Sequence, residues 1–67
     1  AGFLFVEMSD GDTLHTLSLT NNLGDFVLSK ETNMAIARID MNSLLPGTYY
    51  LQVNSFSTNV SVKIVKL

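Results

Sequence analysis

Apolar side chains occupy every second position along most of this chain. A period of two is typical of β-strands, because successive side chains of a strand point to opposite faces, and no segment shows the 3.6-residue period of an amphipathic helix. The pattern predicts about six to seven short strands. The most evident ones cover residues 3–8, 13–20, 25–29, 34–40, 48–53 and 60–67. A helix is expected only around residues 41–45, for one turn at most.

Residues that favour tight turns separate the predicted strands. Asp-Gly-Asp at 10–12 and Pro-Gly at 46–47 are clear signals, because glycine tolerates positive φ, proline presets φ and aspartate bonds to nearby backbone. Residues 21–24 join two strands into a hairpin, and 30–33 and 54–59 are expected to be polar loops. Short strands at a spacing of about ten residues indicate an all-β fold, a small antiparallel, immunoglobulin-like β-sandwich.

The first predicted strand is apolar in both of its phases. Leu4, Val6 and Met8 fall in one phase and Phe3 and Phe5 in the other. A strand of this kind is expected to have both faces at least partly covered.

The Pro46-Gly47 turn is followed two residues later by Tyr49, on the most regular of the predicted strands. A tyrosine just after a corner is expected to enter the core while its hydroxyl bonds to backbone nearby, as in immunoglobulin-like sandwiches. Leu45, Pro46, Gly47 and Tyr49 are therefore interpreted first as a structural corner. Direct contact with a receptor is the alternative, and the two roles are compatible.

Length and charge narrow the function classes. The 67 residues make one domain, residues 1–67, and lack cysteine, so neither a disulfide framework nor a thiolate metal site is available. The net charge is −2 and the four basic residues are scattered, which argues against a nucleic-acid partner. No apolar run is long enough to span a bilayer. A low charged fraction gives weak protection against edge pairing, so an edge-strand or strand-swapped dimer is expected.

The chain offers little equipment for catalysis. His15 is the only histidine, and without cysteine no nucleophile, base and acid can be assembled around it, so we expect an ordinary strand histidine and no enzyme. The turn at Asp10-Gly11-Asp12 has two carboxylates, which is a weak indication of calcium and more often a solvated turn. No metal or other cofactor is therefore expected.

Three segments together carry a resemblance to a known family. Residues 39–53 (IDMNSLLPGTYYLQV) resemble the signature of type IX secretion sorting domains, an Ile-Asp pair, then Leu-Pro, then Gly-x-Tyr followed by alternating aliphatics. Residues 19–27, with Gly24 between two strands, are similar to the family's earlier motif, and residues 61–67 are similar to its terminal strand. The usual Asn-Pro pair before the first strand is absent, so no cleavage site is identifiable.

The resemblance implies a non-enzymatic, folded C-terminal signal that directs a cargo protein across the outer membrane of a member of the Bacteroidota. The cargo would precede Ala1 and pass through the periplasm to the cell surface or the medium. The implied partners are the outer-membrane type IX translocon, its shuttle β-barrel and a sortase-like protease that removes the domain. The residues expected to be recognised, besides Gly24 and the corner, are Lys63, Ile64, Val65, Lys66 and Leu67.

Two interpretations of the terminal segment remain open. Lys63 and Lys66 are typical of an edge strand whose charges discourage pairing, but a terminal strand is also accessible to a partner that extends a sheet, which we favour. The alternative function is an adhesion or carbohydrate-binding sandwich appended to a secreted protein. The absence of tryptophan, with only Tyr50 and Phe56 expected to be exposed aromatics, argues against it.

Overall fold

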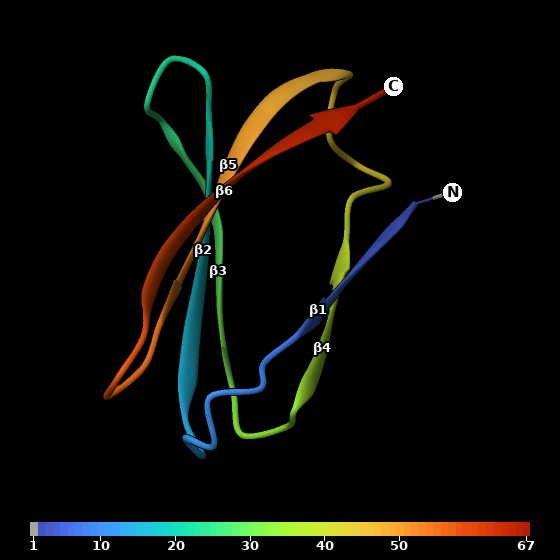
Figure 1. Cartoon of the computed structure of the whole chain (residues 1–67). Coiled ribbons are helices and arrows are strands. Elements are labelled where there is room, and N and C mark those ends of the chain that lie inside the picture. The colour runs from blue at the N-terminus through green and yellow to red at the C-terminus, as the bar shows by residue number, and fades with distance from the viewer. Residues whose placement is uncertain (1) are drawn as a thin grey trace.

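The computed structural model describes residues 2–67 and contains six strands in two antiparallel sheets (Figure 1). The strands are β1 (Phe3–Glu7), β2 (His15–Asn21), β3 (Phe26–Thr32), β4 (Ile36–Asp40), β5 (Gly47–Asn54) and β6 (Asn59–Lys66). Within residues 2–67 no helix is present, and 41–45 form a turn in which the Leu44 N–H donates to the Met41 carbonyl at 3.1 Å. The all-β, sandwich-like fold expected from the sequence is confirmed.

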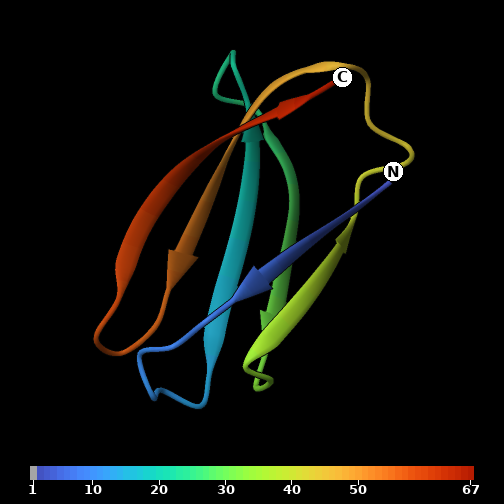
Figure 2. The same cartoon turned by 45° about the vertical axis from the view of Figure 1, so that its right-hand side comes forward.

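The larger sheet has the order β3-β2-β5-β6, and the smaller one pairs β1 with β4. Figures 1 and 2 show the small sheet facing the large one, with both chain ends on the same side of the molecule. Two opposite sides of the sandwich are thereby defined. On one side β3 lies next to β4, and on the other β6 faces β1 across a groove.

The core lies between the sheets and is built from every second residue of the inner strands. Leu17 and Leu19 of β2 are fully buried, and Leu51 of β5 is 3% exposed. Both β2 and β5 are interior strands of the larger sheet, so neighbouring strands protect their backbone as well. The buried apolar set is Leu17, Leu19, Ala37, Ile39, Met41, Tyr49, Leu51 and Val53.

Strand β3 extends further than the sequence indicates. Residues 30–32 continue the ladder with β2, where Lys30 pairs with Leu17 and Thr32 with His15, so the loop expected at 30–33 is wrong for most of its length. The strand lies at an edge of the sheet and four of its seven residues are exposed, so polar side chains are tolerated there and hydrophobicity gives no signal.

The two faces of β1 differ. Leu4 and Val6 are half-buried against the core, whereas Phe3 is 48% and Phe5 66% exposed on the outer face. The guanidinium carbon of Arg38 on β4 lies 4.7 Å from the centre of the Phe3 ring and supplies part of the cover expected for that face. No third layer packs outside the small sheet within the described residues, which leaves Phe5 in solvent.

Candidate functional site

The terminal strand β6 is an edge strand that pairs only with β5 among the described strands. The ladder runs from Gly47 opposite Lys66 to Asn54 opposite Asn59. Ile64 points inward and is half-buried, whereas Lys63 and Val65 are exposed on the outer face. The five terminal residues expected to form the recognition element therefore do not share one environment.

The corner before β5 has the geometry that the sequence predicts. Tyr49 is 7% exposed, and its hydroxyl donates to the Leu45 carbonyl at 2.5 Å. Gly47 has φ +151°, a backbone angle that residues other than glycine rarely adopt. Leu45 is 79% exposed. Tyr49 is thus a structural staple, and Leu45 is the member of the corner that faces solvent.

Lys66 clamps the end of β6. Its Nζ donates to the Met41 carbonyl at 2.6 Å and to the Leu44 carbonyl at 2.5 Å, both in the loop between β4 and β5. Lys63 makes no such bond within the described residues and projects from the edge strand, so of the two lysines only Lys63 fits the role of a charge that discourages edge pairing.

The hairpin containing Gly24 lies at the same end of the large sheet as the corner. Gly24 has φ +86°, and its N–H donates to the Asn21 carbonyl at 3.1 Å. Asn21 in turn pairs with Tyr49 on β5. Gly24, the corner and the Lys66 clamp are therefore gathered at one end of the molecule.

The opposite end of β6 is fixed by an acidic latch, which we define as Asp10 and Asp12 together with the loop residues Ser55, Ser57 and Thr58. Asp10 accepts from the Thr58 hydroxyl at 2.5 Å and from Ser55 at 3.0 Å. Asp12 accepts from the Ser57 hydroxyl at 2.7 Å, the Ser57 N–H at 2.9 Å and the Ser55 hydroxyl at 2.8 Å. The latch ties the β1–β2 loop to the β5–β6 loop.

These donors set the charge state of the latch. The Thr58 hydroxyl, followed by His15, holds the pKa of Asp10 far below its ordinary value. The hydroxyl and N–H of Ser57 likewise lower the pKa of Asp12. A carboxylate that accepts several hydrogen bonds is stabilised in its charged form. Both aspartates therefore serve as ionised acceptors for the loop, with both oxygens of Asp10 and one oxygen of Asp12 already bonded to protein donors.

His15 is buried at the base of the latch, 2% exposed. Its Nε2 lies 2.9 Å from each carboxylate oxygen of Asp10 and donates to them, whereas Nδ1 has no partner among residues 2–67. Within those residues no group of three His, Cys, Asp or Glu side chains is close enough to hold a metal ion. The histidine orients Asp10 and anchors the start of β2.

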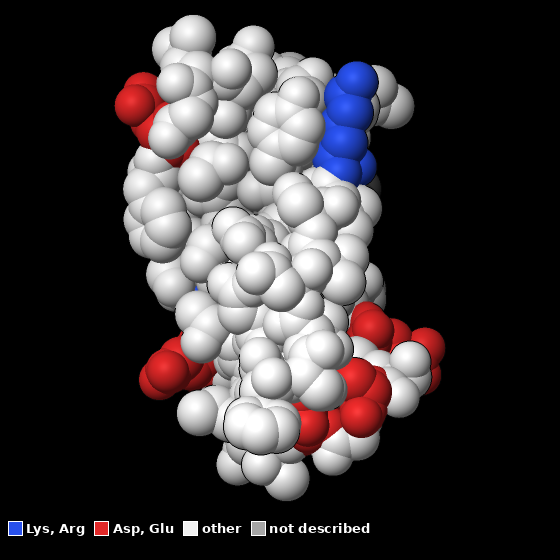
Figure 3. Space-filling view, turned by 60° about the vertical axis from the view of Figure 1, so that its left-hand side comes forward, with Lys and Arg blue, Asp and Glu red and all other residues white. Residues whose placement is uncertain are grey.

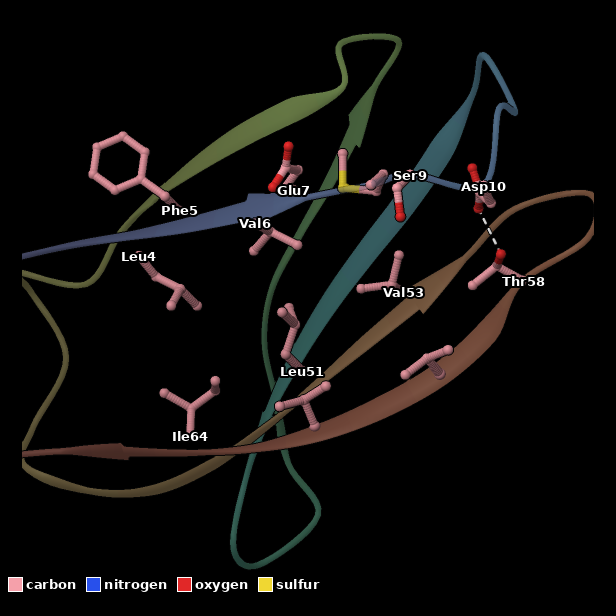
Figure 4. Close-up of a pocket in the computed structure, with 13 residues that line it drawn as sticks. Leu4, Phe5, Val6, Glu7, Ser9, Asp10, Leu51, Val53, Thr58 and Ile64 are labelled. Atoms are coloured by element: carbon pink, nitrogen blue, oxygen red, sulfur yellow. Dashed lines mark hydrogen bonds between the residues drawn. The ribbon is translucent and has the colours of Figure 1, made fainter.

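Between its two clamped ends, β6 is uncovered. Its inward residues Val60 and Val62 are 47% and 44% exposed, although their partners Val53 and Leu51 on β5 are buried. They line an apolar groove of about 510 Å³ between β1 and the β5–β6 pair. In Figure 4, Leu4 and Val6 point into this groove toward Leu51 and Ile64, Phe5 points away from it, and the Asp10–Thr58 bond lies at one end.

Charge is sparse on the face of the molecule drawn in Figure 3. Figure 3 shows a broad uncharged middle, with most acidic side chains toward one end and basic side chains at the other. Within residues 2–67, no helix is long and apolar enough to cross a membrane.

Taken together, the two-sheet fold, the clamped terminal strand and the uncovered groove define a small all-β sandwich domain with one open side. The whole chain, residues 1–67, matches the family model described as the secretion system C-terminal sorting domain. The chain belongs to this family, the type IX secretion sorting domains, as its resemblance predicts. No curated protein and no solved structure matches the chain.

Membership gives the function at a coarse level. The family consists of sorting signals and not of enzymes, so the domain works with the type IX secretion machinery on an attached cargo protein. The protein is exported and reaches the cell surface or the medium.

Proposed function

We propose that this domain is the folded signal by which the type IX translocon and its shuttle β-barrel carry an N-terminal cargo across the outer membrane. The cargo passes through the periplasm, and a sortase-like protease removes the domain once the cargo is outside. The family match over residues 1–67 supports this proposal. The whole folded domain, attached at its N-terminal side to the cargo, is the unit that the machinery reads.

The recognition element in this proposal is the terminal strand with the corner beside it, in which Tyr49 and Lys66 hold the shape that the exposed side chains present. It comprises Gly24, Leu45, Pro46, Gly47, Tyr49, Lys63, Ile64, Val65, Lys66 and Leu67. The observation that carries it is the double clamp on β6: the latch at its start and Lys66 at its end. An edge strand held in place at both ends presents a fixed shape, so a receptor orders little backbone on binding.

A secretion reporter tests the proposal directly. Residues 1–67 are fused to the C-terminus of an inert periplasmic protein, in a host that carries the machinery. We expect the reporter in the medium or on the surface, and we expect it to remain in the periplasm when Lys63 to Leu67 are deleted. A full-length fusion that stays in the periplasm contradicts the proposal.

The deletion also removes the Lys66 clamp, so a second variant separates recognition from folding. Lys63, Val65 and Leu67 are exposed, and their replacement by serine leaves the inward side of β6 intact. We expect this triple variant to unfold at nearly the same denaturant concentration as the parent domain but to be exported less. Normal export of the triple variant would show that the exposed face of the terminal strand is not what the machinery contacts.

A further inference from the structure

The backbone of β1 has one unpaired edge. The Met8 N–H donates to the Ala35 carbonyl and the Gly2 carbonyl accepts from Met41, so the even-numbered residues of this strand bond to β4. In an antiparallel ladder alternate residues point their N–H and C=O groups to opposite sides. The N–H and C=O groups of Phe3, Phe5 and Glu7 therefore point away from β4, along the rim of the apolar groove.

The small sheet is too narrow to cover the large one. It has two strands against four, and β6 is the strand left without a facing partner. Val60 and Val62 are therefore almost half exposed, although the β5 residues that pair with them are buried. A strand added to β1 would lie about 4.8 Å further out in the same sheet. Its inward side chains would then cover the inner face of β6.

We propose that the free edge of β1 is a strand-addition site for an extended peptide segment of the export machinery. The segment runs antiparallel to β1, has aliphatic residues at alternate positions facing Val60 and Val62, and has a basic residue near its N-terminal end. This inference rests on the proposed function and adds a second contact with the terminal strand: besides the exposed face, the partner covers the side chains of its inner face, while the backbone bonds are made to β1.

The residues that line the groove favour an extended segment with aliphatic side chains and one basic residue. Its walls are apolar, and Glu7 and Asp10 at one end are its only charged lining residues. Asp10 is engaged in the latch, whereas the carboxylate of Glu7 has no hydrogen-bond or ion-pair partner among residues 2–67. An antiparallel strand begins beside Glu7, so a lysine or arginine there complements the uncompensated charge. A row of unpaired backbone groups requires an extended chain, since only a strand satisfies alternate donors and acceptors.

The edge of β6 is the competing site, and it is less suited. The ladder with β5 directs the backbone groups of Asn59, Ser61, Lys63 and Val65 outward, as the Ser55–Thr58 bond at the turn fixes the phase. The side chains at these positions are mostly polar, and Lys63 projects from the middle of the edge. Such a charge discourages strand addition. On β1 the corresponding positions are Phe3, Phe5 and Glu7, so the one charge lies at the end of the edge and not in its middle. The exposed rings of Phe3 and Phe5 add contact area for a neighbouring strand.

Binding of a designed peptide to the isotope-labelled domain tests the site. The probe is a synthetic heptapeptide with an N-terminal lysine and valines alternating with threonines, and the control has the same composition with its valines consecutive. We expect the probe to slow amide exchange at Phe3, Phe5 and Glu7 and to shift the methyl signals of Val60 and Val62. Protection confined to Ser61 and Lys63 would place the occupant on the other edge and overturn the proposal.

A matched pair of proline variants identifies the edge. Phe5→Pro removes an N–H that points away from β4, and Ser61→Pro removes the equivalent N–H that points away from β5. Proline is tolerated at such positions of edge strands. We expect Phe5→Pro to weaken peptide binding by about tenfold or more, and Ser61→Pro to leave it within about twofold. Equal losses would contradict the assignment.

Val62→Lys provides a second test that does not touch β1. It places a charge on the opposite wall of the groove, and we expect the same loss of binding while the domain stays folded with only a small drop in its unfolding midpoint, because Val62 is 44% exposed. Protection of β1 that rises with protein concentration in the absence of peptide would identify a second copy of the domain as the occupant and overturn the proposal.

The export assay separates this inference from the proposed function. With the reporter fusion, we expect Phe5→Pro and Val62→Lys to reduce export and Ser61→Pro to retain it. Normal export of Phe5→Pro, together with loss of export on deletion of Lys63 to Leu67, would refute the β1 site and leave the sorting function intact. A parent fusion that is never exported would refute the sorting function itself.

Discussion

The two sides of the sandwich differ in whether a side chain joins the two sheets. On the side where β3 lies next to β4, the Lys30 ammonium donates to the Arg38 carbonyl at 2.8 Å and so bridges the two sheets at the free edge of β4. On the side where β6 faces β1, no such bridge joins the two strands within residues 2–67, and the groove exposes valines. We refer to these as the bridged side and the open side.

The difference shows which part of a small domain is available for recognition. The core of a chain of this length is small, so each inward apolar side chain that remains exposed lowers the stability relative to a buried one. On the open side that loss is concentrated in one groove beside a free backbone edge, and the clamps at both ends of β6 keep the groove in shape. Stability and recognition are thereby assigned to different sides of the same sheet pair.

Core substitutions should show the largest contrast between the interior and the open side. Leu19→Ala empties a fully buried position, and we expect a loss of about 2–5 kcal/mol, enough to unfold much of the domain at 25 °C. Val62→Ala on the open side should cost about 1 kcal/mol or less, because nearly half of that side chain is already in solvent. Urea unfolding of the two variants measures the difference, and similar losses would mean that the groove is covered in solution.

The acidic latch should make the domain sensitive to acid. The pKa values of Asp10 and Asp12 are lowered on folding, so their contribution is fully present above the unfolded-state pKa of about 3.9 and is lost as the pH falls below it. We expect the urea midpoint of the parent domain to fall steeply below about pH 4 and that of the Asp10→Asn/Asp12→Asn variant to fall less. Thr58→Val, which removes a donor to Asp10, should flatten the acid dependence in part.

If the urea midpoints of all three proteins fell equally with decreasing pH, the latch would not be formed in solution. The variants should also start from a lower midpoint at neutral pH, because the Ser55, Ser57 and Thr58 donors lose their ionised acceptors.

How far the sequence predicts this molecule depends on the range of the interaction. The strands and the Tyr49 corner follow from local patterns, because a period of two and a Pro-Gly turn act over a few neighbouring residues. The latch was not predicted, since Asp10 and Ser55 are 45 positions apart and no local rule relates them. The only available signal was the Asp-Gly-Asp turn together with a loop rich in serine and threonine.

The open groove likewise could not be predicted from the sequence. Val60 and Val62 alternate with polar residues as core residues do, and this local pattern does not indicate that the facing sheet has only two strands. The different roles of Lys63 and Lys66 also depend on tertiary structure, because the Lys66 partners are carbonyls in the loop between β4 and β5. Predictions of the terminal strand as a unit therefore missed that one lysine stabilises the fold.

The two lysines test this division of roles. Lys66→Met keeps the aliphatic stem but removes two charge-assisted bonds to backbone carbonyls, and we expect a loss of about 1–2 kcal/mol. Lys63→Met, which removes an exposed ammonium, should change the free energy of unfolding by less than about 0.5 kcal/mol. Equal effects in urea unfolding would indicate that the clamp at the end of β6 is absent in solution.

The smallest effect is expected at the corner, where one hydroxyl can be removed without disturbing the packing of its ring. Tyr49→Phe deletes the bond to the Leu45 carbonyl, and the loss should be about 1 kcal/mol, since the buried ring stays in place and only the bond and its geometry are lost. Tyr50→Phe, one position along on the outer face and 40% exposed, is the matched control and should be nearly neutral. Because the corner lies at the end of the sheet where Lys66 also bonds, Tyr49→Phe should leave peptide binding in the groove unchanged. A parallel loss of binding would mean that the corner helps to hold the open side in shape, and the separation between the stabilising and the recognising parts of the domain would then fail.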